Sequence, residues 1–281
     1  MAVTVEPMRL RYLLIVLALA LPAAAGLGYY ATEIEPASIQ LRRYDVTVDA
    51  PALKGLRVAV ISDLHAGAPH VGLAKLDKIV AMTNEAKPDV ILLTGDYSVG
   101  RMMGARVIRI RDIAAHLKPL KARLGVYAVV GNHDRWRDPG RVFRFFPANG
   151  IPVLENRSVD VGAFWVTGIG DEHTHAADPV RALKTVPKGA TALCFTHSPD
   201  IFANLSPVCG LTVAGHTHGG QVWLPLLGRP AVMIASDFGQ RYAIGTVREN
   251  GRTLFVSPGI GTSNLPIRFG VPPEVSLLEL R

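Results

Sequence analysis

The residues that could do chemistry are carboxylates, imidazoles and one amide, each placed where a short apolar run ends. They are Asp63, His65, Asp96, Asn132, His133, His197, His216 and His218. Taken singly, each suits a loop or turn. Crowded together, uncompensated carboxylates and imidazoles would be costly to remove from water. Two divalent cations would offset that cost, because carboxylate, amide and imidazole ligands suit Mn²⁺, Zn²⁺ or Fe²⁺.

The segment LTVAGHTHGGQ (211–221) shows the pattern most clearly. An apolar run ends in His216 and His218, two residues apart and surrounded by glycines. Two such imidazoles on an extended segment can serve two metal ions, which a shared aspartate can hold about 3.5–4 Å apart. We expect Gly215 and Gly219 to let the backbone approach the metals without a Cβ clash. The absence of thiols from the ligand set argues against a structural zinc site.

Five apolar, β-branched runs would position these side chains. Each run ends in a polar residue, and segments with helical spacing follow several of them; the runs are 56–65, 89–96, 125–134, 191–197 and 211–218. This alternation is typical of an α/β fold, in which a ligand site lies beyond the carboxyl ends of the strands.

The segments between these runs predict helices and further strands. The stretch 151–170 alternates like antiparallel strands, and 241–259 predicts a hairpin that turns at Asn250-Gly251. Two helical faces are predicted by spacing, one formed by Leu73, Leu76, Ile79 and Val80 and the other by Val107, Ile110, Ile113, Ala114 and Leu117.

The N-terminal segment is apolar enough to cross a bilayer. The stretch YLLIVLALALPAAAGLGYY (12–30) has the length of about 20 residues that a membrane span needs. Two interpretations remain open. The small residues Ala23-Ala24-Ala25 indicate a cleaved signal peptide, whereas the extra length and the interfacial Tyr29-Tyr30 pair indicate an uncleaved anchor. We favour the anchor.

The flanking charges and the anchor define the expected organisation. Arginines precede the span and glutamates follow it, which favours an extracytoplasmic catalytic domain, although Arg42 and Arg43 blunt this inference. We expect residues 1–32 to be the anchor or signal segment. Residues 33–54 form a lead-in with an edge strand at YDVTVDA, and residues 55–281 form the main domain.

The composition limits the partners. The chain has 281 residues, 49% of them hydrophobic, so it can bury one large core or two small ones. Its formal net charge of +7 favours anionic partners. No run of five basic residues occurs, which disfavours nucleic acid. Cys194 and Cys209 lie in apolar stretches, and we expect two buried thiols rather than a disulfide.

The polar strand ends form five motifs whose order resembles that of the calcineurin-like metallophosphoesterases. The resemblance covers residues 55–281, and it extends to the membrane-tethered bacterial branch that contains YkuE- and YaeI-type phosphodiesterases. It implies a four-layer α/β/β/α sandwich with two mixed sheets after one N-terminal transmembrane helix. The motifs are D-x-H at 63–65, G-D at 95–96, G-N-H-D at 131–134, His197, and G-H-x-H at 215–218.

The resemblance also implies roles for individual residues. His133 is not a ligand in the family pattern; it would stand beside the leaving group as a proton donor or charge stabiliser, with Asp134 behind it as an orienter. Two cations would lower the pKa of a bridging water and bind the phosphoryl oxygens. The implied ligands are Asp63, His65 and His218 for one metal, Asn132, His197 and His216 for the other, and Asp96 for both.

Four further positions bear on which variant of this site the chain contains. Purple acid phosphatases carry a tyrosine three residues after the G-D aspartate, where this chain has Val99, so we do not expect a ferric-tyrosinate site. We interpret His173 and His175 as part of a solvated or substrate-facing loop rather than a third metal site. Arg268 is either a salt-bridged core arginine or a phosphate contact.

Three functions fit these features. The first is a phosphodiesterase or pyrophosphatase that acts on a lipid-linked or nucleotide-lipid substrate resembling UDP-2,3-diacylglucosamine. The second is a tethered phosphodiesterase or nuclease of soluble substrates. The third is a non-catalytic metal-binding scaffold, against which the intact His133 and ligand set weigh. The native metal and the oligomeric state are left open.

Overall fold

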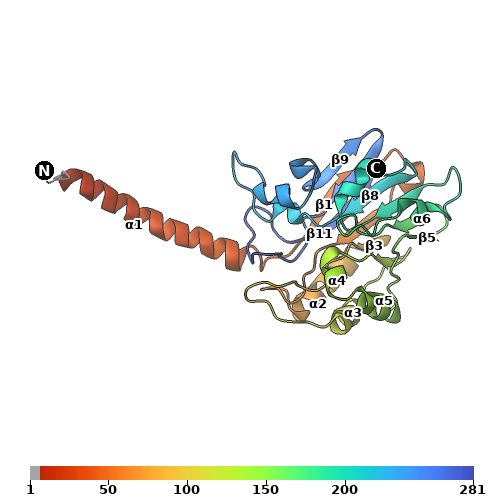
Figure 1. The fold of residues 1–281 in the computed structure, drawn as a ribbon, viewed down its shortest axis with the longest axis horizontal. Helices are drawn as coiled ribbons and strands as arrows, with labels where there is room; N and C mark the ends of the chain where they lie inside the picture. Colours follow the sequence, from red (N-terminus) through yellow and green to blue (C-terminus); the bar gives the residue numbers. More distant parts are fainter. Residues whose placement is uncertain (1–6) are drawn as a thin grey trace.

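Two β-sheets packed face to face form the centre of the molecule (Figure 1). The computed structural model describes residues 7–281, so the first six residues of the predicted 1–32 segment lie outside the described residues. The strands are β1 (Gln40–Val46), β2 (Arg57–Ile61), β3 (Val90–Leu93), β4 (Val126–Ala128), β5 (Arg157–Asp160), β6 (Trp165–Gly168), β7 (Ala192–Phe195), β8 (Cys209–Ala214), β9 (Gly245–Glu249), β10 (Arg252–Val256) and β11 (Glu274–Leu280).

Both sheets contain parallel and antiparallel strands. The first has the order β1-β11-β2-β3-β4, in which only β11 and β2 run antiparallel. The second has the order β5-β6-β7-β8-β10-β9, with antiparallel pairs at its two edges. All five predicted runs contain a strand. The lead-in contributes the edge strand β1, but this strand ends at Val46 and so overlaps only the first three residues of the predicted YDVTVDA (44–50). The hairpin that turns at Asn250-Gly251 is confirmed as β9 and β10.

Helices cover the outer faces of the sheets. Figure 1 shows α2, α3 and α5 together beside the first sheet. The α-helices are α1 (Pro7–Tyr29), α2 (Leu73–Glu85), α3 (Ile110–Leu117), α4 (Asn132–Arg137), α5 (Pro139–Ala148) and α6 (Pro179–Leu183). The other helical turns are η1 (Tyr30–Ile34), η2 (Pro51–Leu53), η3 (Pro199–Asn204), η4 (His218–Gly220), η5 (Pro230–Ile234) and η6 (Gly239–Tyr242).

Alternating side chains of the strands fill the spaces between layers. On β2, Val58 and Val60 pack toward the second sheet, where they join the cluster of Phe195 and Val213. The alternate residues Ala59 and Ile61 pack toward the helices. A third cluster lies between the second sheet and α6 with η3. The predicted four-layer α/β/β/α sandwich is therefore confirmed. Val107 was assigned wrongly to a helix face, because α3 begins only at Ile110 and Val107 is exposed.

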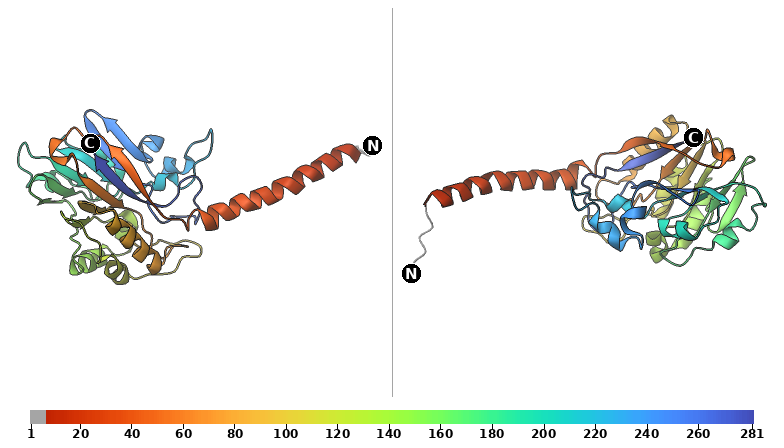
Figure 2. Two further views of the ribbon diagram at one scale, coloured as in Figure 1. Left: turned by 180° about the vertical axis from the view of Figure 1, so that it is seen from behind. Right: turned by 90° about the horizontal axis from the view of Figure 1, so that it is seen from above.

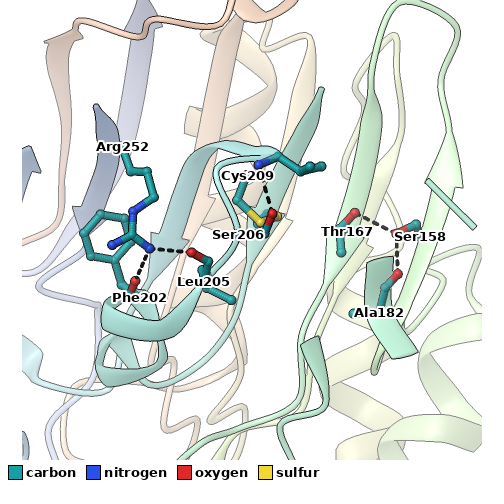
Figure 3. Close-up of a disulfide and its surroundings, with 10 residues drawn as sticks. Ser158, Thr167, Ala182, Phe202, Leu205, Ser206, Cys209 and Arg252 are labelled. Atoms are coloured by element: carbon teal, nitrogen blue, oxygen red, sulfur yellow. Dashed lines mark hydrogen bonds between the residues drawn. A yellow bond between two sulfur atoms is a disulfide. The ribbon is translucent and has the colours of Figure 1, made fainter. Parts of the chain in front are cut away.

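The two cysteines form a disulfide, contrary to the expectation of free thiols (Figure 3). Cys194 on β7 and Cys209 on β8 lie on neighbouring parallel strands, with Cα atoms 5.4 Å apart, a separation that a disulfide can span. The pairing of β7 with β8 shifts register between Ala192 and Leu193. Burial of both residues was predicted from the sequence, but their proximity depends on this pairing, which the apolar pattern does not specify.

The N-terminal helix leaves the body of the molecule as a single rod (Figures 1 and 2). Residues 11–34 are long and apolar enough to cross a membrane by length and composition, and an apolar window of 18 residues within this stretch has no buried residue. The predicted N-terminal apolar helix is therefore present. Its last turn continues into η1 and then into the lead-in to β1.

Candidate metal centre

The predicted ligands converge at the carboxyl ends of strands from both sheets. Asp63 and His65 follow β2, and Asp96 follows β3. His197 follows β7, while His216 and its neighbours follow β8. Asn132 is the first residue of α4, directly after β4. Because strand ends of two facing sheets meet here, residues far apart in the sequence, such as Asp63 and His218, contact one another.

The first group of side chains consists of Asp63, His65 and His218. The Nε2 atoms of the two imidazoles lie 3.1 Å apart. The Nε2 atom of His218 lies 3.5 Å from the Asp63 carboxylate. All three side chains are buried. Their ligand atoms are close enough together to hold one metal ion.

The second group consists of Asn132, His197 and His216. The amide oxygen of Asn132 lies 2.8 Å from Nε2 of His197 and 2.9 Å from Nδ1 of His216. The same two imidazole nitrogens are 3.1 Å apart. An amide oxygen and two imidazole nitrogens directed at one point are a donor set suited to a transition-metal ion.

Asp96 lies between the two groups. One carboxylate oxygen is 3.5 Å from Nε2 of His65 in the first group and 3.4 Å from Nε2 of His197 in the second. This is the bridging position that the family resemblance implies. The structure thus brings together all seven side chains predicted as metal ligands; their coordination of an ion stays a prediction.

The chemistry of the donors fits divalent cations. Burial lowers the pKa values of His65 and His216 to about 3, so both rings are neutral at neutral pH and offer a lone pair. Burial, together with the nearby charge of Asp96, raises the pKa of Asp63 to about 6. Burial disfavours the charged form of His197, but the adjacent Asp96 carboxylate outweighs it and raises the pKa of His197. A buried cluster of this kind needs positive charge, which bound cations would supply.

The backbone at this cluster adopts conformations that non-glycine residues seldom use. Strain of this kind collects at functional sites, where the surrounding structure holds it in place. Five of the seven predicted ligands have φ between 41° and 69°, namely Asp63, His65, Asp96, His216 and His218.

The two glycines that flank the histidines have different reasons for their small size. A Cβ atom on Gly215 would collide with the Ser62 hydroxyl and the Asp63 carboxylate, so this position has to be open for the strand ends to meet. Gly219 has φ of 58° and lies against Val271 rather than against the metal ligands. The predicted close approach therefore holds for Gly215, whereas Gly219 serves the local turn.

His133 stands beside the predicted ligands on the first turn of α4. Its ring centre lies 4.8 Å from that of His65, and its Nε2 atom lies 3.3 Å from the Ser263 hydroxyl. Burial lowers its pKa. Its ring can also reach a point shared with His65 and Asp96. The separation of His133 from the ligands therefore rests on the family pattern.

Asp134 does not orient His133, and that prediction is corrected. Within the described residues 7–281, its carboxylate accepts hydrogen bonds from the backbone amides of Asp96 (2.8 Å), Tyr97 (3.0 Å) and Gly131 (3.2 Å). These contacts hold the loop that presents Asp96. Asp134 thus positions the loop that carries Asp96, and its place as the last residue of the G-N-H-D motif did not indicate this.

The surroundings of Arg268 bear on its two predicted roles. Arg268 is fully buried and donates to the carbonyls of Pro258, Gly261 and Val271, and it forms no salt bridge within residues 7–281. One of its guanidinium nitrogens lies 3.5 Å from Nδ1 of His218, and a phosphate contact stays a prediction. Tyr97, which follows Asp96 in the chain, is buried, and its hydroxyl lies within hydrogen-bond distance of the carbonyls of Leu93 and Val129.

The loop that carries His173 and His175 divides into two environments. The ring of His173 lies 4.8 Å from that of His216 and lines the cavity above the site. His175 is exposed and does not line that cavity. The interpretation as a substrate-facing loop is consistent with the position of His173.

A cavity of about 380 Å³ opens above the predicted ligands. Several of the residues that line it were not predicted from the sequence, including Trp136, Gln221 and Leu265. The ring of Trp136 lies 5.2 Å from that of His133, and their spacing of three residues on a helix could have indicated this contact. Gln221 and Leu265 lie on irregular segments, for which the sequence offers no comparable signal.

The sandwich and its shared-carboxylate cluster define a class of dinuclear metallohydrolases. Comparison with known proteins identifies the family: a model of the calcineurin-like phosphoesterase family matches residues 56–220. The chain belongs to this family, whose members depend on two metal ions.

Three relatives illustrate the range of the family. A zebrafish (Danio rerio) transmembrane protein with a metallophosphoesterase domain is 30% identical over 82% of this chain, which spans about half (54%) of that relative's length. The metallophosphoesterase YkuE of Bacillus subtilis is 27% identical over 93% of this chain and 92% of its own. The phosphodiesterase YaeI of Escherichia coli is 28% identical over 92% of this chain and 93% of its own.

Proposed function

We propose that this chain hydrolyses phosphodiester or pyrophosphate bonds at a dinuclear metal site. The observation that carries the proposal is the position of Asp96 between two groups of buried ligand atoms. Bound there, two divalent cations would supply a water of lowered pKa and polarise the phosphoryl oxygens. Mn²⁺, Zn²⁺ and Fe²⁺ all suit the donor set. The name of the relative YaeI supports a phosphodiester rather than a phosphomonoester.

The chain's own residues would bind and orient the substrate around this centre. His133 is placed to protonate or stabilise the leaving oxygen, because it borders both the ligand cluster and the cavity. Asp134 fixes the loop of Asp96 through three backbone amides. Trp136 and His173 form one wall of the cavity, where they can contact the group attached to the phosphate.

The finer substrate class that we propose is a lipid-linked or nucleotide-lipid phosphoester. Its support is the apolar α1 together with an apolar cavity wall that contains Val222, Ile234, Leu265 and Ile267. A soluble phosphodiester would make no use of either feature. The non-catalytic scaffold is disfavoured because His133 and the whole ligand set are present in one cluster.

We also propose that residues 1–32 anchor the chain to a membrane, with 33–54 as lead-in and 55–281 as the catalytic domain outside the cytoplasm. The α1 helix and the transmembrane relative support membrane association. The buried Cys194–Cys209 disulfide supports an oxidising compartment, since such bonds are rare in the cytosol.

The proposal is tested with the purified full-length chain in detergent micelles. The protein is stripped of metal by a chelator and then supplied separately with Mn²⁺, Zn²⁺ or Fe²⁺. Hydrolysis of a chromogenic phosphodiester and of the matching phosphomonoester is measured for each. We expect at least one metal to restore hydrolysis, with the diester preferred. Undiminished hydrolysis after complete metal removal would contradict the proposal.

A further inference from the structure

An exposed apolar segment lies next to the proposed active site. Residues 222–235 (VWLPLLGRPAVMIA) contain one charged residue, Arg229, and no acidic residue. Large apolar side chains on a protein surface usually mark a contact with a partner or a membrane. We define the apolar rim as the exposed side chains Trp223 (44% exposed), Leu226 (105%), Leu227 (67%), Met233 (66%), Ile234 (85%) and Leu265 (57%).

The backbone holds the tip of this segment away from the core. Leu224 and Gly228 exchange two backbone hydrogen bonds of 2.8 and 2.9 Å, which close a short hairpin. Leu226, at the tip, has φ of 69°, a conformation that a residue with a Cβ atom seldom adopts. The hairpin therefore exposes Leu226 and Leu227. At position 226 the positive φ would favour Gly or Asn, so a leucine there is not explained by the turn itself.

Backbone hydrogen bonds connect the rim to the segment 268–271. The amide of Trp223 donates to the carbonyl of Phe269 (2.8 Å), and the amide of Phe269 donates to the carbonyl of Gln221 (2.9 Å). The Gln221 side chain in turn contacts the backbone of Ser263 and Leu265. The hairpin and Leu265 are thus held by one set of backbone contacts.

The same segment 268–271 also contacts the residues that follow α1. The amide of Arg268 donates to the carbonyl of Ala31 (2.9 Å), and the ring of Tyr30 packs edge-on against that of Phe269. Figures 1 and 2 agree that the loop that contains the rim projects on the side of the body from which α1 leaves, with its tip close to the level of the end of α1.

A buried carboxylate strengthens this connection. Glu35, just after η1, accepts hydrogen bonds from the backbone amides of Gly270 (2.9 Å) and Val271 (2.6 Å). Because charge-assisted hydrogen bonds to a buried carboxylate are strong, the orientation of the domain relative to the end of α1 is constrained. A bilayer crossed by α1 would then meet the rim.

The rim also borders the cavity of the metal centre. Ile234 and Leu265 belong to the rim and line the same cavity as His133 and His216. A molecule that enters from the rim side would therefore pass over apolar side chains before it reaches the predicted ligands.

We propose that the apolar rim inserts into the interfacial layer of the membrane that α1 crosses, so that the cavity receives its substrate from the lipid. The occupant of this surface is bilayer lipid. Trp223 beside a short apolar hairpin suits that layer, where tryptophan is enriched. The statement about substrate entry rests on the proposed phosphodiesterase function, whereas insertion of the rim does not.

Insertion is tested on the full-length chain reconstituted into phosphatidylethanolamine–phosphatidylglycerol vesicles. An environment-sensitive fluorophore is attached at Leu226→Cys and, as a matched control, at Val180→Cys on α6. Val180 is similarly exposed (85%). The helix that carries it, α6, lies on the side of the domain away from α1 (Figure 1). The native cysteines are bonded to each other, so the label goes to the introduced thiol.

We expect the label at position 226 to shift to the blue and to be quenched by doxyl-labelled lipids, while the label at position 180 responds only to a quencher in water. Equal responses at the two positions would overturn the proposal. A shift at position 226 that grows with protein density at fixed lipid composition would also overturn it, because a second copy of the chain would then cover the rim.

Substrate entry is tested with the double variant Leu226→Asp/Leu227→Asp and the control Val180→Asp. Neither leucine touches the metal centre, so we expect turnover of a soluble diester to be unchanged. Turnover of a phosphodiester lipid embedded in vesicles should fall about tenfold in the double variant, as expected for loss of leucine burial. An equal change on both substrates would contradict entry from the lipid. A chain that cleaves no diester would refute the proposed function, and the fluorescence result would still decide on insertion.

Discussion

In most soluble proteins charged side chains are exposed and large apolar side chains are buried, and the metal centre and the apolar rim depart from this rule in opposite ways. At the centre, Asp63, Asp96 and three imidazoles are buried beside one another. At the rim, Leu226 and Ile234 are almost completely exposed. Both arrangements would be unfavourable for an isolated chain in water. Our proposals account for each by a component from outside the chain, namely cations at the centre and lipid at the rim.

The two regions also hold their side chains by the same means. Asp96 and His216 at the centre, and Leu226 at the rim, all have positive φ. Hydrogen bonds of the surrounding backbone maintain these conformations. At the centre the amides of Asp96 and Tyr97 donate to the Asp134 carboxylate, and at the rim Leu224 and Gly228 exchange two backbone bonds. The two regions differ in the chemical groups that they present. The centre offers ligand atoms with lone pairs, and the rim offers apolar side chains.

The largest effect is expected from Asp96→Ala. Because this carboxylate lies within 3.5 Å of an imidazole of each ligand group, its removal should abolish hydrolysis and release most of the bound metal. Metal content per chain, measured by elemental analysis, and diesterase activity provide the check. A variant that retains two tightly bound metals would refute the bridging role.

A smaller effect is expected from His133→Ala. If His133 acts on the leaving group without binding metal, turnover should fall by about 10²–10⁴-fold, the usual contribution of a general acid. Metal content should stay nearly unchanged. Loss of one metal equivalent would instead identify His133 as a ligand, which its approach to His65 and Asp96 allows geometrically.

The dependence of stability on pH should distinguish the metal-free from the metal-bound centre. Burial raises the pKa of Asp63 from 3.8 to about 6 and that of Asp134 to about 7, so the folded state holds protons that the unfolded state has lost. These two carboxyls should therefore contribute stability to the metal-free fold that is lost as the pH rises through this window. The buried imidazoles of His65 and His216, whose pKa values are lowered to about 3, act in the opposite direction, because their burial costs stability below the unfolded histidine pKa.

Added Mn²⁺ should counter that loss by neutralising Asp63. We expect the rise in Tm on adding metal to be larger at about pH 8 than at about pH 5, by a few degrees for a chain of this size. Thermal unfolding with and without metal at the two pH values provides the measurement. A metal effect that is equal or larger at acid pH would contradict the assignment of Asp63.

The smallest effect on hydrolysis is expected from removal of the anchor. The full-length chain should stay with membranes after carbonate extraction, whereas a chain that begins at Glu33 should be soluble. The shorter chain should still cleave a small phosphodiester, since every proposed ligand lies beyond residue 60 and Glu35 is retained. A mature N-terminus at Gly26 with the protein in the soluble fraction would establish a signal peptide instead.

The fold and the ligand cluster could be predicted because they depend on short, repeated patterns. Apolar runs that end in Asp, Asn or His specify the strands and place their polar ends together, as His197 and His216 show. The Cys194–Cys209 bond could not be predicted, since it depends on how β7 and β8 pair.

The rim and the role of Asp134 depend on contacts between distant irregular segments. Trp223 meets Phe269, and the Asp134 carboxylate meets the amide of Asp96. Neither contact follows a helical or strand period, so hydrophobic patterning carries no information about them. The exposed leucines of 222–235 could easily be mistaken for a core strand.

The most direct test of the dinuclear centre is anomalous X-ray diffraction from crystals of the full-length chain loaded with Mn²⁺. We predict two peaks about 3.5–4 Å apart, as in other two-metal sites. The Asp96 carboxylate should lie between them, with His65 and His218 on one ion and His197 and His216 on the other. A single peak, or two ions without a shared carboxylate, would contradict the assignment.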